Sequence, residues 1–506
     1  MSILHTYHSK LPFRNVKGKP SITVSSKGIS NGLSDIYNDG ADFGPDTLLN
    51  ATYPNQYGPP YTQTSGIQEA YNYGKIKYNN NWTSVFTIVL GEGVFVLNND
   101  VNLSIGQNAT DTSRPQAVNI TGQGIRSTMV LVNQPNLNGI VLSIPNSNYG
   151  AEDITFSHFA IDIPYAPSPP YGLTSWGSTK INAIASNPTG KGANSAISYL
   201  SYGNGGQGGQ FILNNIHLFT GNWNDGYGPT NGGLYVWGVE NVIATNSTFG
   251  GDRALALIGS NTALAGGSSN YDSQLYATFY GCYVGFTYNS YITGYNVSII
   301  GSNVEGNINL NYNSTTQGLR TNLSIEKSTM AAQLDLTDAT VDFINLNNVN
   351  ISGNYYPKYN AIIGSASPVN ANQLILKNIA YWYSGLPNLL YNVNFSEYYI
   401  EGFNNINSNA ITLPTQSTTS GTTAGTVKMD AVTYRTSYKK YVITFSGYEN
   451  DTTTNQTISF PLSFSSYAVI SANNTGLTIS ASTSGITITA PNSTATYSGI
   501  VIVEGY

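Results

Sequence analysis

The sequence predicts an all-β protein in which a right-handed parallel β-helix is followed by a small C-terminal β-sandwich of the jelly-roll type. Three observations predict it. Most of the chain consists of short β-rich runs with alternating apolar positions and no sustained helical period. Several of these runs repeat one pattern along the chain. Beyond residue 426 the alternation becomes more regular still, which is typical of a sandwich.

The repeated pattern is a strand, a small or amide residue, two more residues and then an apolar one. Successive runs end 20 to 35 residues apart, as expected for coils of a β-solenoid with loops of variable length. Stacked coils would place amide on amide and aliphatic on aliphatic. An all-β sandwich or propeller remains the alternative, although it would show more even spacing and hairpin turns. The runs end at Leu218, Phe249, Val284, Val304, Met330, Ile351 and Tyr381.

Composition divides the chain into four segments. They are a basic N-terminal segment (1–35), the β-helix (36–408), a Ser/Thr-rich linker (409–425) and the β-sandwich (426–506). The first segment has no acidic residue before Asp35 and is either a solvated tail or an anchor for an acidic partner. Its candidate anchoring residues are Lys10, Arg14, Lys17 and Lys19.

Charged residues make up 9% of the chain, against about 25% in an ordinary soluble protein. A surface of amides and hydroxyls keeps its character at any pH, which favours an external location. With 20 Lys and Arg against 26 Asp and Glu, the chain lacks the basic footprint of a nucleic-acid-binding protein. We expect no membrane-spanning segment, no metal and no cofactor. The single cysteine, Cys282, is expected to be a buried, unreactive residue.

The start of the solenoid carries NDGADFGPDT, TSGIQEAYNYG, TIVLGEGVFVL and AVNITGQGIRSTMVLV. It resembles the entry of the pectin-lyase-like β-helix superfamily. The resemblance implies that residues 67–73 form a helix capping the first coil. It also implies one turn at Gly91 and Gly93 and a second at Gly122 and Gly124. Phage tailspikes and sugar-modifying enzymes share this entry, so it indicates fold rather than activity.

The segment GTVKMDAVTYRTSYKKYVITFSGYEN resembles a terminal domain of virion proteins from viruses of hot-spring archaea. The start of the chain shows no apolar core of a secretory signal, and a protein that leaves the cell on a particle needs none. Together the two resemblances imply a homotrimeric β-helix protein on the virion surface. The basic charge of the N-terminal segment favours it as the part that joins other virion proteins.

Glycoside hydrolases need two carboxylates flanking the scissile bond. Asp252 lies where polygalacturonase-type members carry a paired acid, but Gly251 replaces the first acid and their accompanying His and Arg-x-Lys motifs are not recognisable. Asp225 is the other weak catalytic candidate, although Asp-Gly is also a common turn. A third acidic set, QLDLTDATVDF, could hold calcium or form a solvated strand face.

Carbohydrate binding requires aromatic side chains that contact the C–H faces of sugars and neighbouring amides and hydroxyls as hydrogen-bond partners. The candidate glycan-binding residues lie in and beside two long insertions: Tyr171, Trp176, Trp223, Tyr227, Tyr235 and Trp237. The function we expect is a virion spike or fibre that recognises a host-surface polysaccharide or glycoprotein glycan. A polysaccharide lyase or glycoside hydrolase is the alternative, so enzymatic activity stays open. A purely structural virion component is the second alternative.

Overall fold

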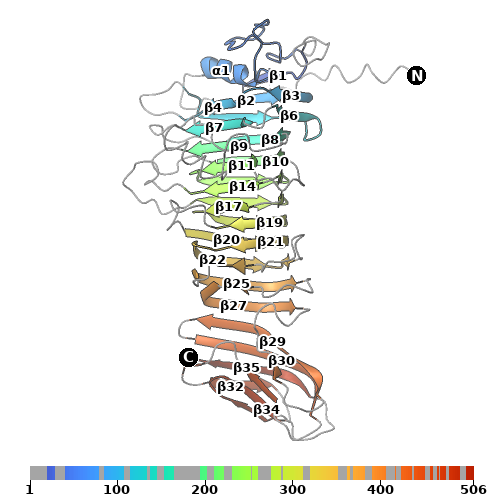
Figure 1. The fold of residues 1–506 in the computed structure, drawn as a ribbon, viewed down its shortest axis with the longest axis vertical. Helices are drawn as coiled ribbons and strands as arrows, with labels where there is room; N and C mark the ends of the chain where they lie inside the picture. Colours follow the sequence, from blue (N-terminus) through green and yellow to red (C-terminus); the bar gives the residue numbers. More distant parts are fainter. Residues whose placement is uncertain are drawn as a thin grey trace, which may run out of the picture. The chain divides into compact units, whose positions relative to one another are not determined.

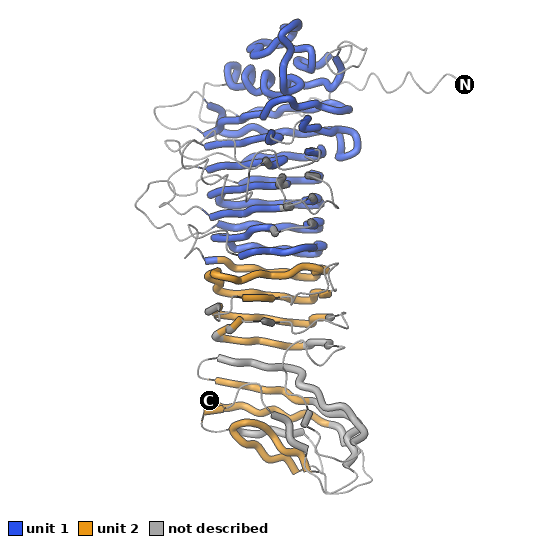
Figure 2. The backbone as a smooth tube through the Cα atoms, viewed as in Figure 1, with its two compact units in different colours: residues 1–320 blue, residues 321–506 orange. Residues whose placement is uncertain are grey.

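The structure is a computed structural model. The residues that it describes are 20–28, 40–78, 85–106, 114–133, 137–144, 153–163, 194–201, 210–220, 231–251, 253–259, 275–286, 289–310, 320–351, 362–364, 369–381, 390–391, 393–405, 416–417, 423–435, 438–450, 456–459, 464–465, 468–473, 478–489 and 497–506. They belong to two compact units, residues 1–320 and 321–506 (Figure 2).

Unit 1 is a parallel β-helix, as predicted. Its chain visits three parallel sheets in turn, and each strand pairs with the equivalent strand one coil later (Figure 1). Sheet 1 contains β1 (Ser21–Val24), β2 (Val85–Leu90), β5 (Ala117–Thr121), the start of β8 (Ile154–Ile163), the start of β10 (Gln210–Thr220), β12 (Asn241–Thr245), β15 (Tyr276–Tyr280) and β18 (Asn296–Ile300).

The other two sheets of unit 1 are built in the same way. Sheet 2 contains β3 (Gly93–Leu97), β6 (Thr128–Val132), the ends of β8 and β10, β13 (Thr248–Gly251), β16 (Tyr283–Phe286) and the start of β19 (Asn303–Asn309). Sheet 3 contains β4 (Val101–Ser104), β7 (Ile140–Ile144), β9 (Asn194–Ser201), β11 (Asn231–Trp237), β14 (Arg253–Ile258), β17 (Asn289–Thr293) and the end of β19.

The small or amide residue of the repeated pattern is the corner between sheet 1 and sheet 2. In each repeat it has a positive φ, a left-handed conformation that glycine and asparagine tolerate better than other residues. The pattern therefore encodes the turn that closes each coil. The left-handed corner residues of unit 1 are His158, Asn215, Asn246, Gly281 and Gly301, and those of unit 2 are Lys327, Asn348 and Asn378. Six of these eight are Gly or Asn, whereas His158 and Lys327 adopt the same conformation without being small or an amide.

The predicted capping helix is confirmed as α1 (Ile67–Lys77), one turn longer than expected. It buries Ile67, Ala70 and Tyr71. Gly74 lies so close to the ring of Phe86 on β2 that a side chain there would collide with it. Helix α1 thus covers the end of the core. Nothing in the described part of the chain is a helix long and apolar enough to cross a membrane.

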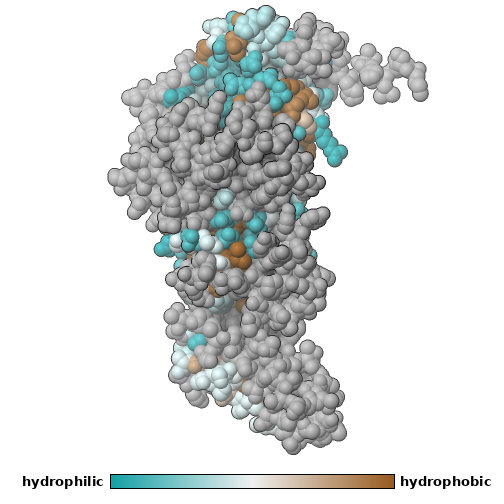
Figure 3. Space-filling model, viewed as in Figure 1, coloured by the Kyte–Doolittle hydropathy of each residue, from teal (hydrophilic) through white to brown (hydrophobic). Residues whose placement is uncertain are grey.

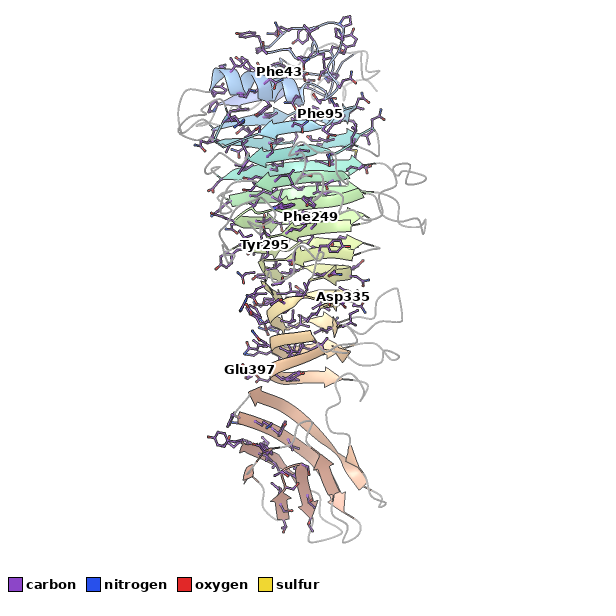
Figure 4. All side chains as sticks on the ribbon, turned by 60° about the vertical axis from the view of Figure 1, so that its left-hand side comes forward. Phe43, Phe95, Phe249, Tyr295, Asp335 and Glu397 are labelled. Carbon is purple, nitrogen blue, oxygen red and sulfur yellow. The ribbon has the colours of Figure 1, made fainter. Side chains whose placement is uncertain are left out.

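Aromatic side chains fill the interior between the three sheets. The ring of Tyr199 on β9 meets that of Phe211 on β10 edge to face, with centroids 5.2 Å apart. Phe249 on β13, labelled in Figure 4, meets Phe279 on β15 in the same way at 5.6 Å. Because these pairs join strands of different sheets, the four rings point inward. Side chains at the neighbouring positions of each strand therefore point outward.

Unit 2 begins with further parallel coils and ends with antiparallel sheets. Its parallel ladders contain β20 (Arg320–Glu326), β21 (Thr329–Asp335), β22 (Thr340–Asn347), β23 (Asn350–Ile351), β24 (Ile362–Ile363), β25 (Val369–Tyr381), β26 (Leu390–Tyr391) and β27 (Val393–Asn405). The edge of β27 then pairs antiparallel with β29 (Thr423–Arg435).

Two antiparallel sheets follow, as expected for the predicted β-sandwich. The first contains β29, β30 (Tyr438–Asn450), β35 (Tyr497–Gly505) and β32 (Ala468–Asn473). The second contains β28 (Gln416–Ser417), β31 (Gln456–Ser459), β34 (Gly485–Thr489) and β33 (Thr478–Ala481). Tyr441 on β30 is fully buried and its ring lies 5.6 Å from that of Phe464.

Candidate functional site

Most of the residues that the sequence suggested for function lie outside the described residues. This holds for the catalytic candidates Asp225 and Asp252 and for the basic residues of the N-terminal segment. It also holds for four of the six aromatic candidates. The residues concerned are Lys10, Arg14, Lys17, Lys19, Tyr171, Trp176, Trp223 and Tyr227.

The remaining two aromatic candidates, Tyr235 and Trp237, lie on β11 and are 0% and 4% exposed. Their neighbour Val236 pairs with the inward-pointing Tyr199, so both rings lie on the outward side of sheet 3. There they pack with an apolar cluster that contains Leu200, Ala256 and Ile258. The expectation that they are sugar platforms is corrected for these two residues, because a buried ring has no face to offer a ligand.

An exposed aromatic pair lies instead on sheet 1, at the two ends of β15. Tyr276 is 51% exposed and Tyr280 is 57% exposed, whereas Ala277 and Phe279 between them are buried. The alternation places both tyrosines and Thr278 on the outer face. Backbone hydrogen bonds to Glu240 and Asn246 hold the two ends of this strand. A rigid sheet thus presents two half-exposed rings.

Amides, hydroxyls and isoleucines surround the two rings. We call the outward residues of three adjacent strands the tyrosine platform. In register, its rows are Asn241, Tyr276 and Asn296; Ile243, Thr278 and Ser298; and Thr245, Tyr280 and Ile300. In the space-filling view of one face of the molecule, described hydrophobic and hydrophilic residues likewise lie interspersed (Figure 3).

Fixed hydrogen bonds orient part of this surface. The hydroxyl of Thr245 donates to Asn214 Oδ1 at 3.0 Å, which joins the platform to the preceding coil. The amide of Asn296 donates to the carbonyl oxygen of Leu275 at 3.3 Å. Groups held in this way lose little conformational freedom when a ligand binds, which favours affinity.

The tyrosine platform contains no charged side chain. The carboxyl group nearest to it in sequence belongs to Glu240, an exposed residue that directly precedes Asn241. Partial desolvation raises the pKa of this carboxyl. The nine residues of the platform itself are uncharged.

A titratable pair lies on the outer face of sheet 2. Asp162 on β8 and His217 on β10 belong to adjacent coils and interact electrostatically. Desolvation raises the pKa of Asp162 and, although Asp162 opposes it, lowers the pKa of His217. On the same face, the Tyr283 hydroxyl donates to Glu305 Oε2 at 2.8 Å. Burial is the main cause that raises the pKa of Tyr283.

The three aspartates of QLDLTDATVDF, which are Asp335, Asp338 and Asp342, do not form a metal site. Asp335 Oδ1 accepts the backbone N–H of Thr337, and Asp342 Oδ1 accepts the amide of Asn372. Asp338 occupies an exposed turn with φ 56°. No group of three potential ligands suited to a metal occurs within the described ranges. The solvated-face interpretation is the one that these contacts favour.

Cys282 is buried at a coil corner, as expected. Its backbone N–H donates to Ser302 Oγ at 3.0 Å and its thiol lies 3.5 Å from the carbonyl oxygen of Ala244. Burial raises the pKa of the thiol, which disfavours the reactive thiolate.

Comparisons with known proteins find only distant similarity. No family model matches the chain, and no curated protein matches it. Among solved structures, it resembles a tailspike protein, gp49 of the Acinetobacter baumannii bacteriophage Fri1, described as a capsular polysaccharide depolymerase. The identity is 11%, the match covers 93% of this chain and 86% of that one, and the TM-score is 0.29.

A second solved structure is the Agl-KA catalytic domain. The identity is 15%, with 61% of this chain and 62% of that one covered, and the TM-score is 0.30. At these scores the matches carry no argument about activity. The assignment of the fold rests on the strand pairing of this chain.

Proposed function

We propose that the protein recognises glycans and that the tyrosine platform is the surface that contacts the sugar. The observation that carries this proposal is the pair Tyr276 and Tyr280, half-exposed on the outer face of a rigid sheet. A sugar ring combines apolar C–H faces with hydroxyl groups. Aromatic rings cover the former, and amides and hydroxyls such as those of Asn241, Thr278 and Asn296 exchange hydrogen bonds with the latter.

The test is glycan binding by Tyr276→Ala, Tyr280→Ala and the double variant. Each single substitution is expected to weaken binding about tenfold, which corresponds to about 1.4 kcal/mol. Tyr53→Ala is the matched control, because Tyr53 is also 57% exposed but lies outside sheet 1. Equal glycan binding by the double variant and the control would show that the tyrosine platform is not the surface that contacts the sugar.

The setting of this activity is also a proposal. The low charge of the chain supports an external location, and the basic N-terminal segment supports attachment to an acidic partner. We place the protein on a virion surface as a homotrimeric spike of the pectin-lyase-like type, held by residues 1–35. Deleting residues 1–19, which keeps β1 (Ser21–Val24) in sheet 1, should then abolish particle attachment and leave glycan binding intact. Attachment of the truncated protein would contradict the anchoring role.

A depolymerase remains the alternative, with Asp225 and Asp252 as its candidates. Its test is the release of shorter fragments from a bound polysaccharide, and the loss of that release in Asp225→Asn or Asp252→Asn. Retention without fragments favours a binding protein.

A further inference from the structure

The tyrosine platform ends at a coil corner that carries no side chain. Tyr280 is the last residue of β15, and Gly281 after it is the left-handed corner between sheet 1 and sheet 2. The backbone N–H of Gly281 donates to the carbonyl oxygen of Ile300 at 3.0 Å, and the corner of that next coil is Gly301. Both glycines are exposed, and a Cβ atom at Gly301 would meet nothing within 4 Å. No side chain of these two corner residues therefore stands between the sheets.

A third tyrosine lies directly beyond this corner. Tyr283 is the first residue of β16 on sheet 2, and it points outward because the next residue, Val284, is fully buried in the core. A Cβ atom at Gly285 would collide with the ring of Tyr283, so the phenol end of the ring lies over the Gly285 backbone. Two residues after the corner, the same coil thus presents another aromatic side chain on its outer surface.

Two hydrogen bonds hold this ring in place. The Tyr283 hydroxyl donates to Glu305 Oε2 at 2.8 Å, and the amide of Asn303 donates to Glu305 Oε1 at 3.0 Å. Asn303 also lies in register with Tyr283 on the neighbouring strand. Burial, and then the hydrogen bond and charge of Glu305, raise the pKa of Tyr283, so the hydroxyl keeps its proton. A ring that is fixed before binding loses little conformational freedom when a ligand covers it.

We infer that the sugar-binding surface of the tyrosine platform continues over the glycine corner onto sheet 2, where Tyr283 is its next contact. There Glu305 and Asn303 offer hydrogen-bond partners for sugar hydroxyls. The Cα atoms of Tyr280 and Tyr283 are at most about 11 Å apart along the chain, so one oligosaccharide can reach both. The ligand is then an oligosaccharide that bends around a coil. This inference rests on the proposed glycan-binding function and adds the extent of its site.

The first test places a side chain on the corner without removing any contact residue. Gly301 has φ 58°, which asparagine tolerates, and open space around it, so Gly301→Asn should keep the fold. Full-length protein is applied to a printed panel of hexose and N-acetylhexosamine oligosaccharides of increasing length. Native protein should gain affinity with length, and Gly301→Asn should lose the gain of the longer members. Gly40→Asn is the matched control, because Gly40 has φ 76° and open space but lies outside both sheets.

The second test removes the contact on sheet 2. Tyr283→Ala should weaken binding of the longer members about tenfold, as expected at Tyr276 and Tyr280. Tyr283→Phe keeps the ring and loses only its hydrogen bond to Glu305, so its loss of affinity should be smaller. Melting temperatures of all variants are measured beside binding, so that only folded proteins are compared.

The outcomes separate this inference from the function on which it rests. Unchanged binding by Gly301→Asn would overturn the path over the corner, and unchanged binding by Tyr283→Ala would overturn the contact on sheet 2. In either case, loss of binding in Tyr276→Ala and Tyr280→Ala would keep the proposed function. Dependence on Tyr283 without dependence on Tyr280 would mean two separate sites and overturn the continuous surface. Failure of the native protein to bind any member of the panel would overturn the proposed function itself.

Discussion

The side chains of His158 and Asn215 occupy the same left-handed corner on consecutive coils, with His158 Nδ1 and Asn215 Nδ2 3.1 Å apart. The corner thus combines an unusual backbone conformation with a side-chain contact that links two coils. Both parts can be tested at Asn215, which has φ 52°.

Asn215→Val should lower the free energy of unfolding by roughly 1–3 kcal/mol, because a β-branched residue is strained at positive φ. Asn215→Gly keeps the backbone conformation and loses only the contact with His158, so it should cost about 1 kcal/mol or less. Denaturant unfolding of the two variants measures the difference. Equal stability of both would show that the corner conformation is not the constraint.

Gly122 should not accept a side chain. A Cβ atom there would collide with the backbone oxygen of His158 and lie 2.9 Å from the Cβ atoms of Phe159 and Thr128. Gly122→Ala is therefore expected to cost roughly 1–3 kcal/mol. The control is Gly301→Asn, at a left-handed corner with open space, which should be close to neutral. Thermal unfolding of both proteins gives the comparison.

Phe249 should contribute strongly to the core of unit 1. It is fully buried against Phe279, so Phe249→Ala should cost roughly 3–5 kcal/mol. Tyr280→Ala, a truncation of similar size on the outer face of sheet 1, should stay within about 0.5 kcal/mol. A large loss of stability in Tyr280→Ala would mean that its effect on binding could not be assigned to contact with the ligand.

Asp162 and His217 should give stability opposite dependences on pH. The lowered pKa of His217 means that stability is lost as pH falls through 6.5, its ordinary value, because the unfolded state then takes up the proton first. The pKa of Asp162 is raised above its ordinary value of 3.8. The stability that this shift contributes to the folded state is therefore fully present below pH 3.8 and is lost as the pH rises through the higher folded-state pKa.

Substitution separates the two groups. His217→Gln should raise the melting temperature relative to the native chain, and this increase should be larger at pH 5 than at pH 7.5. Asp162→Asn should show its largest gain at neutral pH, and the gain should shrink as the pH falls toward 3.8. Melting curves across this range test both signs, and a pH-independent offset for either variant would contradict the assignment.

The coils could be predicted from the sequence because their signal is local. In six of the eight corners a Gly or Asn sets the turn, and the apolar residues that follow point inward. The capping helix was recognisable for the same reason, although it continues beyond Tyr73 to Lys77. Strand pairing between successive coils and the two-unit division depend on contacts distant in sequence, which no local pattern contains.

The site was harder to predict because aromatic residues alone do not reveal which face of a strand is exposed. In GGLYVWG both alternating sets are apolar, so the pattern did not show that Tyr235 and Trp237 are buried. The segment YATFY did carry a signal, with tyrosine at both ends and Thr278 between two buried residues. That signal became meaningful only once the structure showed which residues of β12 and β18 lie beside the two tyrosines.

The alternation of β15 also has an evolutionary consequence. Ala277 and Phe279 maintain the fold, while Tyr276, Thr278 and Tyr280 face the solvent. Two different selective pressures therefore act on alternate residues of one strand. The outward-facing residues of each coil can be substituted without disturbing the inward-facing residues of the core. A lineage of such proteins could therefore change what it adheres to while keeping the same scaffold, and descendants that share the scaffold would retain little recognisable identity.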